Sequence, residues 1–433
     1  MRLSCKIAYA VLVASFILSA CQTATHLKPE GCQQQIIFEI QGISHPVKDI
    51  SENRALLRLE GEISVASVGD IIPHNNVKKA ASQGNIVQGG RSINNEGFDT
   101  LFENVKEYLK ADVTIANYES PIAPINGSSG QPFVFNSDTS LLRAARDANI
   151  NLFNIANNHI YDQDIKGFLE TIENFESEKI RYIGTYTDDK PRPLFLERNG
   201  IRVAFFGFTT LLNNQPDYGR LREYVRKYIG EKDTEEIRKA KEKADIVIVY
   251  IHWGEEYKKE PDESQISLAD ELIEAGADII IGGHPHILQP LSLIASNDMR
   301  IVPVAFSMGN FISNQSRNYA FPISGEDEGR TRDSAILRFK LKKYSYNDIS
   351  FTVVSELYFV PLWTYNNNIQ FSKGVEKRLK IYPFPITERI EQLNKAIVVE
   401  KDENRKKELL LELENLLLRL KLIKGTLGED YVR

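Results

Sequence analysis

Cysteine is scarce in this chain, and its scarcity excludes two kinds of architecture. Among 433 residues there are three cysteines, Cys5, Cys21 and Cys32. We expect Cys5 to leave with an N-terminal signal and Cys21 to be modified, so Cys32 has no partner for a structural disulfide. A cysteine metal site is excluded as well. With 42% hydrophobic residues, the mature chain is expected to fold on its core alone.

A strong charge of either sign is also missing. The chain has 53 Lys and Arg against 59 Asp and Glu, a formal net charge of −6 at pH 7. This mildly acidic balance argues against a general nucleic-acid surface or a surface for anionic membranes, and leaves only local basic patches open. We therefore expect no nucleic-acid partner.

Residues 1–21, MRLSCKIAYAVLVASFILSAC, have the pattern of an export signal. The start is positively charged, and the apolar run from Ile7 to Leu18 is too short for a lasting membrane span. LSAC, which ends at Cys21, resembles the bacterial lipobox, in which cleavage leaves a cysteine that is then acylated. The alternative is a plain signal peptide cleaved near Ala20. We favour the lipobox, which predicts an exported lipoprotein anchored to the membrane of the bacterial cell envelope.

Strands and helices alternate beyond a polar stretch at 22–60, which we interpret as a tether. The strand-like runs are 62–69, 112–117, 151–157, 202–208, 244–254, 277–283 and 300–310. The helix-like segments between them are 98–111, 139–148, 165–177, 233–244 and 264–277. Such alternation predicts an α/β domain, which we place at 61–365. Its last two strands, 333–344 and 349–363, are expected to form either an antiparallel edge or part of a second sheet.

Residues 366–433 are predicted to form a C-terminal helical extension. The segment 387–424 is rich in Leu, Glu and Lys, and leucines recur with a helical period from Leu409 to Leu420. Gly425 is the expected stop of this helix. We prefer a helix packed on its own domain over a coiled-coil partner site.

Histidine is also rare, and its placement indicates a site. Two of the seven histidines lie in the tether, and each of the other five follows a strand-like run directly or within a few residues. These five are His74, His159, His252, His284 and His286. Because parallel strands place their C-terminal ends on one edge of a sheet, we expect the loops that carry these histidines to converge.

Oxygen donors accompany the histidines in the same loops. They are Asp70, Asn117, Glu119, Asn158 and Asp162. Imidazoles combined with carboxylate and amide oxygens suit Mn, Fe, Zn or Mg rather than thiophilic metals. The sequence therefore predicts a divalent-metal site. We expect Gly282 and Gly283 to let the backbone turn sharply into His284 and His286.

The order and wording of these motifs resemble a known family. The motifs are GDIIPH, NYES, IANNHIYD, IHWGEEY, GGHPHILQP and FSMGNFISN, with QPFVFN after the second. Their order is similar to that of the calcineurin-like metallophosphoesterases, and their wording to the poly-γ-glutamate capsule-synthesis (CapA-type) branch. The resemblance covers roughly residues 62–315. It implies a metallophosphoesterase-like four-layer α/β/β/α sandwich.

The resemblance also implies a site for two divalent metal ions. Carried over to matching positions, the ligands are Glu119 as a bridge, Asp70 and His286 for one ion, and Asn158, His252 and His284 for the other. In one place the chain departs from the superfamily, which has a histidine two residues after the aspartate where this chain has Ile72. His74 lies four residues after Asp70 and is a candidate for metal or substrate contact, as are Asn117 and Asn310.

His159 is implied to stay off the metals and face the substrate, with Asp162 or Asp164 as its orienter. As a general acid it would have a pKa near the working pH. Several neighbouring residues leave two interpretations open. Trp253 and Tyr257 line a substrate groove or pack the loop. Arg317, Arg330 and Arg332 bind an anionic polymer or belong to a solvated loop, which we prefer.

Three functions are compatible with this reasoning. The first is a lipid-anchored, metal-dependent hydrolase or transferase of the cell envelope, acting on a phosphoester or an anionic polymer such as poly-γ-glutamate beside capsule-synthesis or export proteins. The alternative is a module that binds a polyanion through its metals for export or anchoring, without turnover. A scaffold with a degenerate site is the third, and the intact ligand set argues against it. We favour the enzyme because a pure binding site does not need His159 beside Asn158.

Overall fold

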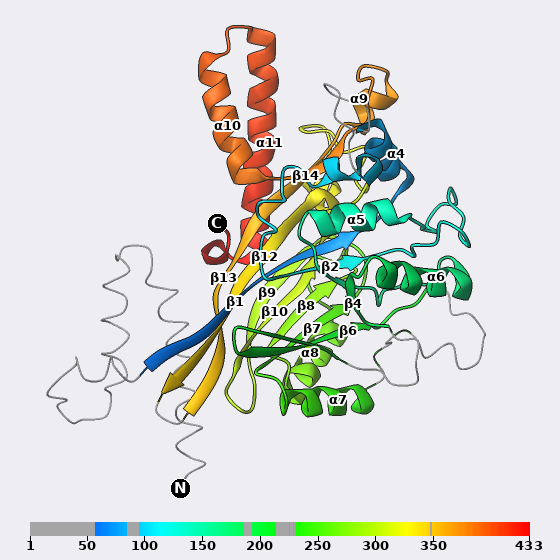
Figure 1. Cartoon of the computed structure of the whole chain (residues 1–433). Helices are drawn as coiled ribbons and strands as arrows, with labels where there is room; N and C mark the ends of the chain where they lie inside the picture. The colour runs from blue at the N-terminus through cyan, green and yellow to red at the C-terminus, as the bar shows by residue number, and fades with distance from the viewer. Residues whose placement is uncertain are drawn as a thin grey trace, which may run out of the picture.

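Two β-sheets lie face to face in this protein, with helices on both outer sides (Figure 1). A computed structural model of the chain describes residues 57–84, 95–185, 193–213, 225, 228, 230–346 and 349–433. The predicted signal peptide, Cys21 and nearly all of the predicted tether lie outside the described residues. The four layers confirm the predicted α/β/β/α fold class.

The first sheet has the strand order β14-β13-β12-β1-β2-β3-β4, and β11 also pairs with β1. Its strands are β1 (Leu57–Ile71), β2 (Val113–Tyr118), β3 (Leu152–Asn154), β4 (Arg181–Ile183), β11 (Asn310–Ile312), β12 (Asp333–Tyr346), β13 (Ile349–Asn366) and β14 (Ile381–Pro385). Strands β1 to β4 and β11 are parallel, whereas β12, β13 and β14 continue the sheet in antiparallel fashion. The two strands predicted at 333–344 and 349–363 are β12 and β13, and with β14 they form the antiparallel side of the first sheet.

The second sheet has the strand order β5-β6-β7-β8-β10-β9. Its strands are β5 (Leu194–Arg198), β6 (Ile201–Thr209), β7 (Ile246–His252), β8 (Ile279–Gly283), β9 (Leu288–Ala295) and β10 (Ile301–Met308). The four inner strands are parallel, and the two edge strands are antiparallel. Every residue of β7 and β8 is buried. Because both faces of these strands are covered, their sequences are unbroken apolar runs rather than alternating ones.

Helices cover the outer face of each sheet (Figure 1). Helices α4 (Asn75–Gly84), α5 (Thr139–Asp147) and α6 (Asp164–Ser177) lie on the first sheet, and α7 (Glu231–Lys241) and α8 (Glu263–Ala275) on the second. Local signals fix their ends: Asp262 and Gln265 form a capping box at the start of α8, and Gly276, with φ 119°, ends it. An apolar core lies between each sheet and its helices. A third apolar core fills the space between the two sheets.

The helix predicted at 98–111 is not an α-helix. Residues Asn95–Leu101 form the 3₁₀ helix η1, and turns follow to Leu109. The apolar residues Phe98, Phe102 and Val105 are buried as a helical period requires, but Phe102 and Val105 donate to carbonyls three residues earlier. The apolar spacing indicated the buried face correctly. It could not distinguish the tighter hydrogen bonds of a 3₁₀ helix from those of an α-helix.

The C-terminal region contains a strand as well as helices. After α9 (Asn368–Ser372), β14 joins the first sheet, which the helical prediction for 366–433 omitted. Helices α10 (Ile386–Val399) and α11 (Glu403–Leu427) then form a hairpin (Figure 1), followed by the short 3₁₀ helix η4 (Glu429–Tyr431). Gly425 lies inside α11, and Gly428, with φ 93°, follows its last residue. The predicted stop is wrong because an exposed helix tolerates a glycine at about 1 kcal/mol.

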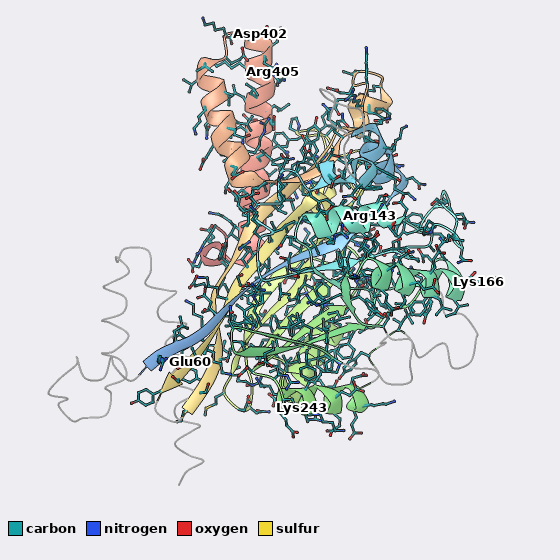
Figure 2. The ribbon with its side chains drawn as sticks, in the orientation of Figure 1. Glu60, Arg143, Lys166, Lys243, Asp402 and Arg405 are labelled. Carbon is teal, nitrogen blue, oxygen red and sulfur yellow. The ribbon has the colours of Figure 1, made fainter. Side chains whose placement is uncertain are left out.

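One side of α11 packs on the core between the sheets, through Leu409, Leu416 and Ile423. The tip of the hairpin, at Asp402 and Arg405, lies at the opposite end of the molecule from Glu60 on β1 (Figure 2). Within the described ranges, no helix combines the length and the apolar character that crossing a membrane requires.

A buried ion pair ties α11 to the first sheet. Arg419 is fully buried and pairs with Asp333 at the start of β12, with Nε 2.8 Å from Oδ1. Its guanidinium also donates to the carbonyl of Glu326, at 2.7 Å, in the 3₁₀ helix η3 (Glu326–Arg332). A single side chain of the hairpin therefore holds both a strand and the segment that precedes it.

Candidate metal centre

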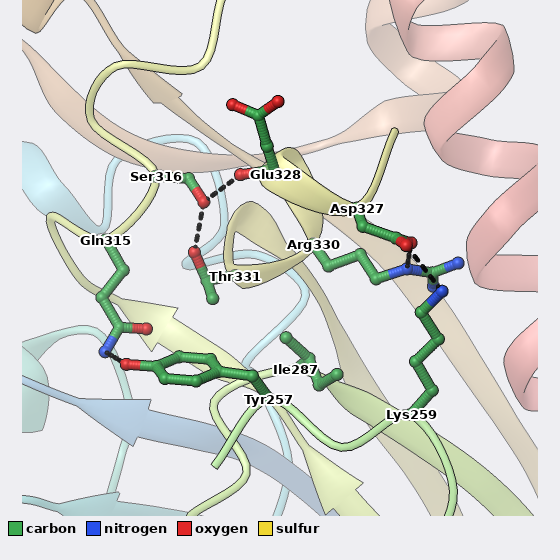
Figure 3. Close-up of a pocket in the computed structure, with 9 residues that line it drawn as sticks. All are labelled: Tyr257, Lys259, Ile287, Gln315, Ser316, Asp327, Glu328, Arg330 and Thr331. Atoms are coloured by element: carbon green, nitrogen blue, oxygen red, sulfur yellow. Dashed lines mark hydrogen bonds and ion pairs between the residues drawn. The ribbon is translucent and has the colours of Figure 1, made fainter. Parts of the chain in front are cut away.

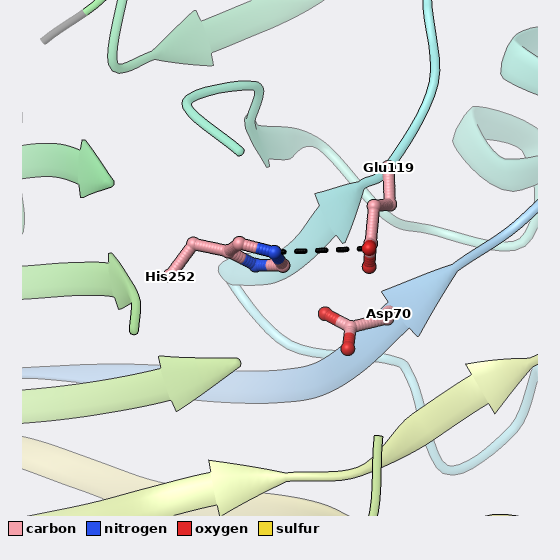
Figure 4. Close-up of side chains that lie close together, drawn as sticks. All are labelled: Asp70, Glu119 and His252. Atoms are coloured by element: carbon pink, nitrogen blue, oxygen red, sulfur yellow. Dashed lines mark ion pairs between the residues drawn. The ribbon is translucent and has the colours of Figure 1, made fainter. Parts of the chain in front are cut away.

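Polar side chains from both sheets meet where the parallel strands end. Asp70 lies near the end of β1, Glu119 directly follows β2, and His252 ends β7. All three are fully buried, and one ligand atom from each lies within 4.8 Å of the others (Figure 4). The expected convergence of loops at the carboxyl ends of parallel strands therefore takes place across the gap between the two sheets.

Three neutral donors face one another at the His252 side of this cluster. His252 Nε2 lies 2.9 Å from Asn158 Oδ1 and 3.2 Å from His284 Nδ1. Burial, and next the charge of His284, lowers the pKa of His252 well below its usual value. Burial, and next His286, lowers the pKa of His284 to about 4. Both imidazoles are therefore neutral near pH 7, and separations of about 3 Å suit ligands around one ion that lies about 2 Å from each.

His286 and Asp70 form the other side of the cluster. His286 Nδ1 lies 3.2 Å from Asp70 Oδ2, and the same oxygen lies 3.4 Å from the backbone nitrogen of His284. Nitrogen and carboxylate oxygen together match the donor chemistry of a borderline divalent cation.

Glu119 lies between these two sides. Its Oε1 is 3.7 Å from His252 Nε2 and 3.8 Å from His286 Nε2, and this buried oxygen accepts no hydrogen bond from any described residue. Burial, and next the carboxylate of Asp70, raises the pKa of Glu119 well above its usual value. A buried carboxylate oxygen with no donor is costly unless a cation compensates it, so the residues fit a divalent metal.

Asn117 contacts two of the candidate ligands, Asp70 and His252, through its side-chain amide. Its Oδ1 accepts hydrogen bonds from Asn154 (3.0 Å) and Asn157 (3.3 Å), so its Nδ2 faces Asp70 Oδ1 at 2.8 Å and His252 Nδ1 at 3.3 Å. With its oxygen engaged, Asn117 orients ligand side chains, as outer-shell partners of metal sites do. Sequence reasoning missed Asn154, although a polar residue that ends an apolar strand was a usable signal.

The strained backbone of the GGHPH segment lies at the histidines and not at the glycines. His284 has φ 94° and His286 has φ 59°, in a region that non-glycine residues rarely adopt. Gly282 and Gly283 are required for space instead. A Cβ on Gly282 would lie 1.9 Å from the carbonyl oxygen of Phe306, and one on Gly283 would lie 2.8 Å from Asp70 Oδ1. The expectation that the glycines make the turn is therefore wrong.

His159 faces the cluster without joining it. Its Nδ1 lies 2.7 Å from Asp162 Oδ2, and its Nε2 is 4.0 Å from Glu119 Oε1. The same Asp162 oxygen accepts from the backbone N–H of Phe135 at 2.6 Å, and the Phe135 ring packs on the imidazole with centroids 4.3 Å apart. Of the two aspartates considered as orienters, Asp162 contacts His159, whereas Asp164 begins α6.

The remaining candidates lie around this centre. His74 Nδ1 accepts from the backbone of Asn314 at 3.3 Å, and its ring contacts Phe135. Asn310 pairs with Asp70 in the β11–β1 register and donates to Gln315 Oε1 at 2.9 Å; its own Oδ1 is buried with no partner among the described residues. Ile72 is buried and, as an aliphatic side chain, supplies no ligand.

Two of the open alternatives have a structural answer. Trp253 is buried and donates through Nε1 to the carbonyl of Phe306 at 2.9 Å, so it packs the loop. Arg332 is buried over the Trp363 ring and donates to the carbonyl of Thr364 at 2.7 Å, so it does not face solvent.

The fold and the site define an α/β protein with a buried cluster of carboxylate, imidazole and amide groups that fits a divalent metal. A family model described as "Bacterial capsule synthesis protein PGA_cap" matches residues 64–315. This chain therefore belongs to that family, which confirms the predicted family.

Individual relatives agree with this family. Over 287 residues the chain is 29% identical to PGA biosynthesis protein CapA of Bacillus subtilis (strain 168), covering 65% of this chain and 68% of that protein. It is 30% identical over 299 residues to capsule biosynthesis protein CapA of Bacillus anthracis, covering 65% and 64%. Among solved structures, sulfate thiohydrolase SoxB of Thermus thermophilus aligns with 67% of this chain and 56% of its own, at 13% identity and a TM-score of 0.36.

Proposed function

We propose that this chain is a divalent-metal-dependent hydrolase or transferase of capsule synthesis that acts on an anionic polymer, with poly-γ-glutamate as the first candidate and a phosphoester as the second. The observation that carries the proposal is the buried Glu119 Oε1, which accepts no hydrogen bond from the described residues and lies between two groups of candidate ligand atoms. The names of the two CapA relatives support the polymer.

The proposed site would hold two ions. Glu119 would contribute to both, Asp70 and His286 would hold one, and Asn158, His252 and His284 would hold the other. When bound, two divalent ions stabilise negative charge as Lewis acids and lower the pKa of a coordinated water. The chain itself contributes orientation, because Asn117 fixes Asp70 and His252 through its amide nitrogen.

His159 is the proposed general acid. Asp162 engages Nδ1 and leaves Nε2 directed toward the centre, where it donates a proton to the leaving group. Phe135 covers the imidazole on one face and keeps water away from that face. Because a metal-coordinated water would already have a lowered pKa, this division of work would need no second base in the chain.

The test compares His159→Asn with His252→Ala, both purified and reconstituted with Mn²⁺. We expect His159→Asn to keep the parent metal content and to lose about 100- to 10,000-fold in turnover of an aryl phosphodiester or of poly-γ-glutamate. His252→Ala should lose metal and stability together. Asp162→Asn should lower turnover, and Asp164→Asn is its matched control. If His159→Asn loses metal as His252→Ala does, the assignment of His159 is wrong.

If the parent binds metal and turns over neither substrate, the chain is a polyanion-binding module and not an enzyme. A parent that retains no metal in elemental analysis and turns over neither substrate is instead a degenerate scaffold.

We also propose that the chain is exported and anchored to the membrane through an acylated Cys21. The support is LSAC after an apolar run. Cys21→Ser should yield unprocessed precursor or a protein without acyl chains in mass spectra of the membrane fraction. Equal absence of acyl chains from the parent and the Ser variant would disprove the anchor.

A further inference from the structure

A pocket of about 450 Å³ lies beside the candidate metal centre (Figure 3). Three separate stretches of the chain form its wall: the loop after β7, the residue that follows His286, and the segment from Gln315 to Thr331. Ile287 and the Tyr257 ring give it an apolar side, and Lys259, Asp327 and Arg330 lie together on another side (Figure 3). A pocket with an apolar side and a few convergent charged groups is typical of a ligand site.

The pocket is adjacent to the candidate metal centre. The Tyr257 ring centroid is 6.1 Å from that of His286, and Ile287 is the next residue in the chain. Gln315 connects the two sites, since its Oε1 accepts from Asn310 at 2.9 Å and its Nε2 donates to the Tyr257 hydroxyl at 3.3 Å. If the metals hold one residue of a chain-like substrate, the next residue of that substrate lies within reach of this pocket.

Two cations in the pocket share one carboxylate. Lys259 Nζ lies 2.7 Å from Asp327 Oδ2, and Arg330 Nε lies 2.6 Å from Asp327 Oδ1 (Figure 3). The other acidic group of the lining, Glu328, is engaged elsewhere, because its carboxylate accepts from the backbone of Gly325 at 2.9 Å. Lys259, Arg330 and Asp327 together carry one net positive charge, and the charge of Glu328 makes the whole lining neutral.

The shared carboxylate is easily exchanged. The side chains of Lys259 and Asp327 are 50% and 63% exposed, and exposed ion pairs contribute only about 0–1 kcal/mol. Arg330 is held more firmly, with its side chain 18% exposed, and its planar guanidinium suits two-point contact with a carboxylate. An incoming carboxylate can therefore replace Asp327 at little cost.

We propose that this pocket binds a free carboxylate pendant from the backbone of an amide-linked anionic polymer, through Lys259 and Arg330, at the residue next to the one held by the metals. The statement that the metals hold the neighbouring polymer residue rests on the proposed function. The binding of a carboxylate in the pocket does not rest on it. Gln315 and Thr331, whose side chains both donate and accept, are the partners for the polymer's amide groups.

Calorimetry with a short γ-linked glutamate oligomer and its analogue with α-carboxamides in place of the free α-carboxylates tests the proposal. The double variant Lys259→Gln, Arg330→Gln should bind the oligomer about tenfold or more weakly, with little change for the analogue. Asp327→Asn should act in the opposite direction and tighten oligomer binding, because it removes the competing carboxylate. Lys258→Gln, whose amine pairs with Glu255 outside the pocket, is the matched control.

The proposal is overturned if the double variant binds the oligomer like the parent, if Asp327→Asn weakens binding, or if the analogue binds the parent as tightly as the oligomer. Displacement of the oligomer by equimolar inorganic phosphate would also overturn it, in favour of a phosphate site. The metal content of the double variant should equal that of the parent. If the binding shifts occur and the parent shows no turnover, the pocket stands and the proposed catalysis fails.

Discussion

Replacing Gly283 by alanine tests whether the metal ligands are held by close packing. The new Cβ would lie 2.8 Å from Asp70 Oδ1 and 3.4 Å from His252 Nδ1. To restore an ordinary contact of 3.4 Å, the Asp70 carboxylate must move by about 0.6 Å. Such overpacking typically costs about 1–3 kcal/mol of stability. Asp70 also receives the hydrogen bond of Asn117, and loss of such support lowers metal affinity by about 10- to 100-fold.

The measurements are urea unfolding of the metal-free protein and competition for metal with a fluorescent chelator. We expect Gly283→Ala to be destabilised and to bind metal more weakly, while Gly425→Ala binds metal like the parent. A Gly283→Ala variant with parental affinity and parental stability would refute the reasoning, because it would show that Asp70 and His252 move freely. The refutation would not depend on any enzymatic activity.

Three further predictions concern stability. Gly425→Ala, where the new Cβ meets nothing within 4 Å, should stabilise α11 by about 1 kcal/mol in urea unfolding. Arg419→Met leaves the Asp333 carboxylate buried and unpaired and should cost about 3–5 kcal/mol, against little for the exposed Arg405→Met. Burial, and next His286, lowers the pKa of His284 to about 4, so its contribution is complete above pH 6.5 and is lost as pH falls from 6.5 to about 4. In chelator-treated protein, the parent should lose about 2 kcal/mol more than His284→Gln between pH 7 and pH 5.

The convergence of the site residues followed from the sequence for a general reason. Alternating strands and helices impose parallel strands, and parallel strands bring their ends to one edge. Asp70, Glu119 and His252 could therefore be placed together without coordinates. The site residues are divided between two facing sheets. This division could be learned only from the order of the strands, which no local pattern contains.

Two features could not be obtained from local patterns. The direction of the Asn117 amide depends on donors from Asn154 and Asn157, and an amide can be turned either way until its neighbours are known. The pocket joins Tyr257, Ile287 and the 315–331 segment, which are distant in sequence. Tyr257 and Arg330 were separate candidates for substrate contact, and no local pattern placed them together. A long-range arrangement of ordinary residues leaves no periodic or motif signal.

The contact of Arg419 with η3 has a consequence for divergence within the family. The family match ends at residue 315, whereas Asp327, Arg330 and Thr331 of the pocket lie on η3, which α11 holds through Glu326. Under the proposed function, substitutions in η3 or in α11 would alter which polymer is accepted while the proposed metal ligands, all between Asp70 and His286, stay intact. Members of the family with identical motifs would then differ in substrate, and the C-terminal third of the sequence is the place to look for that difference.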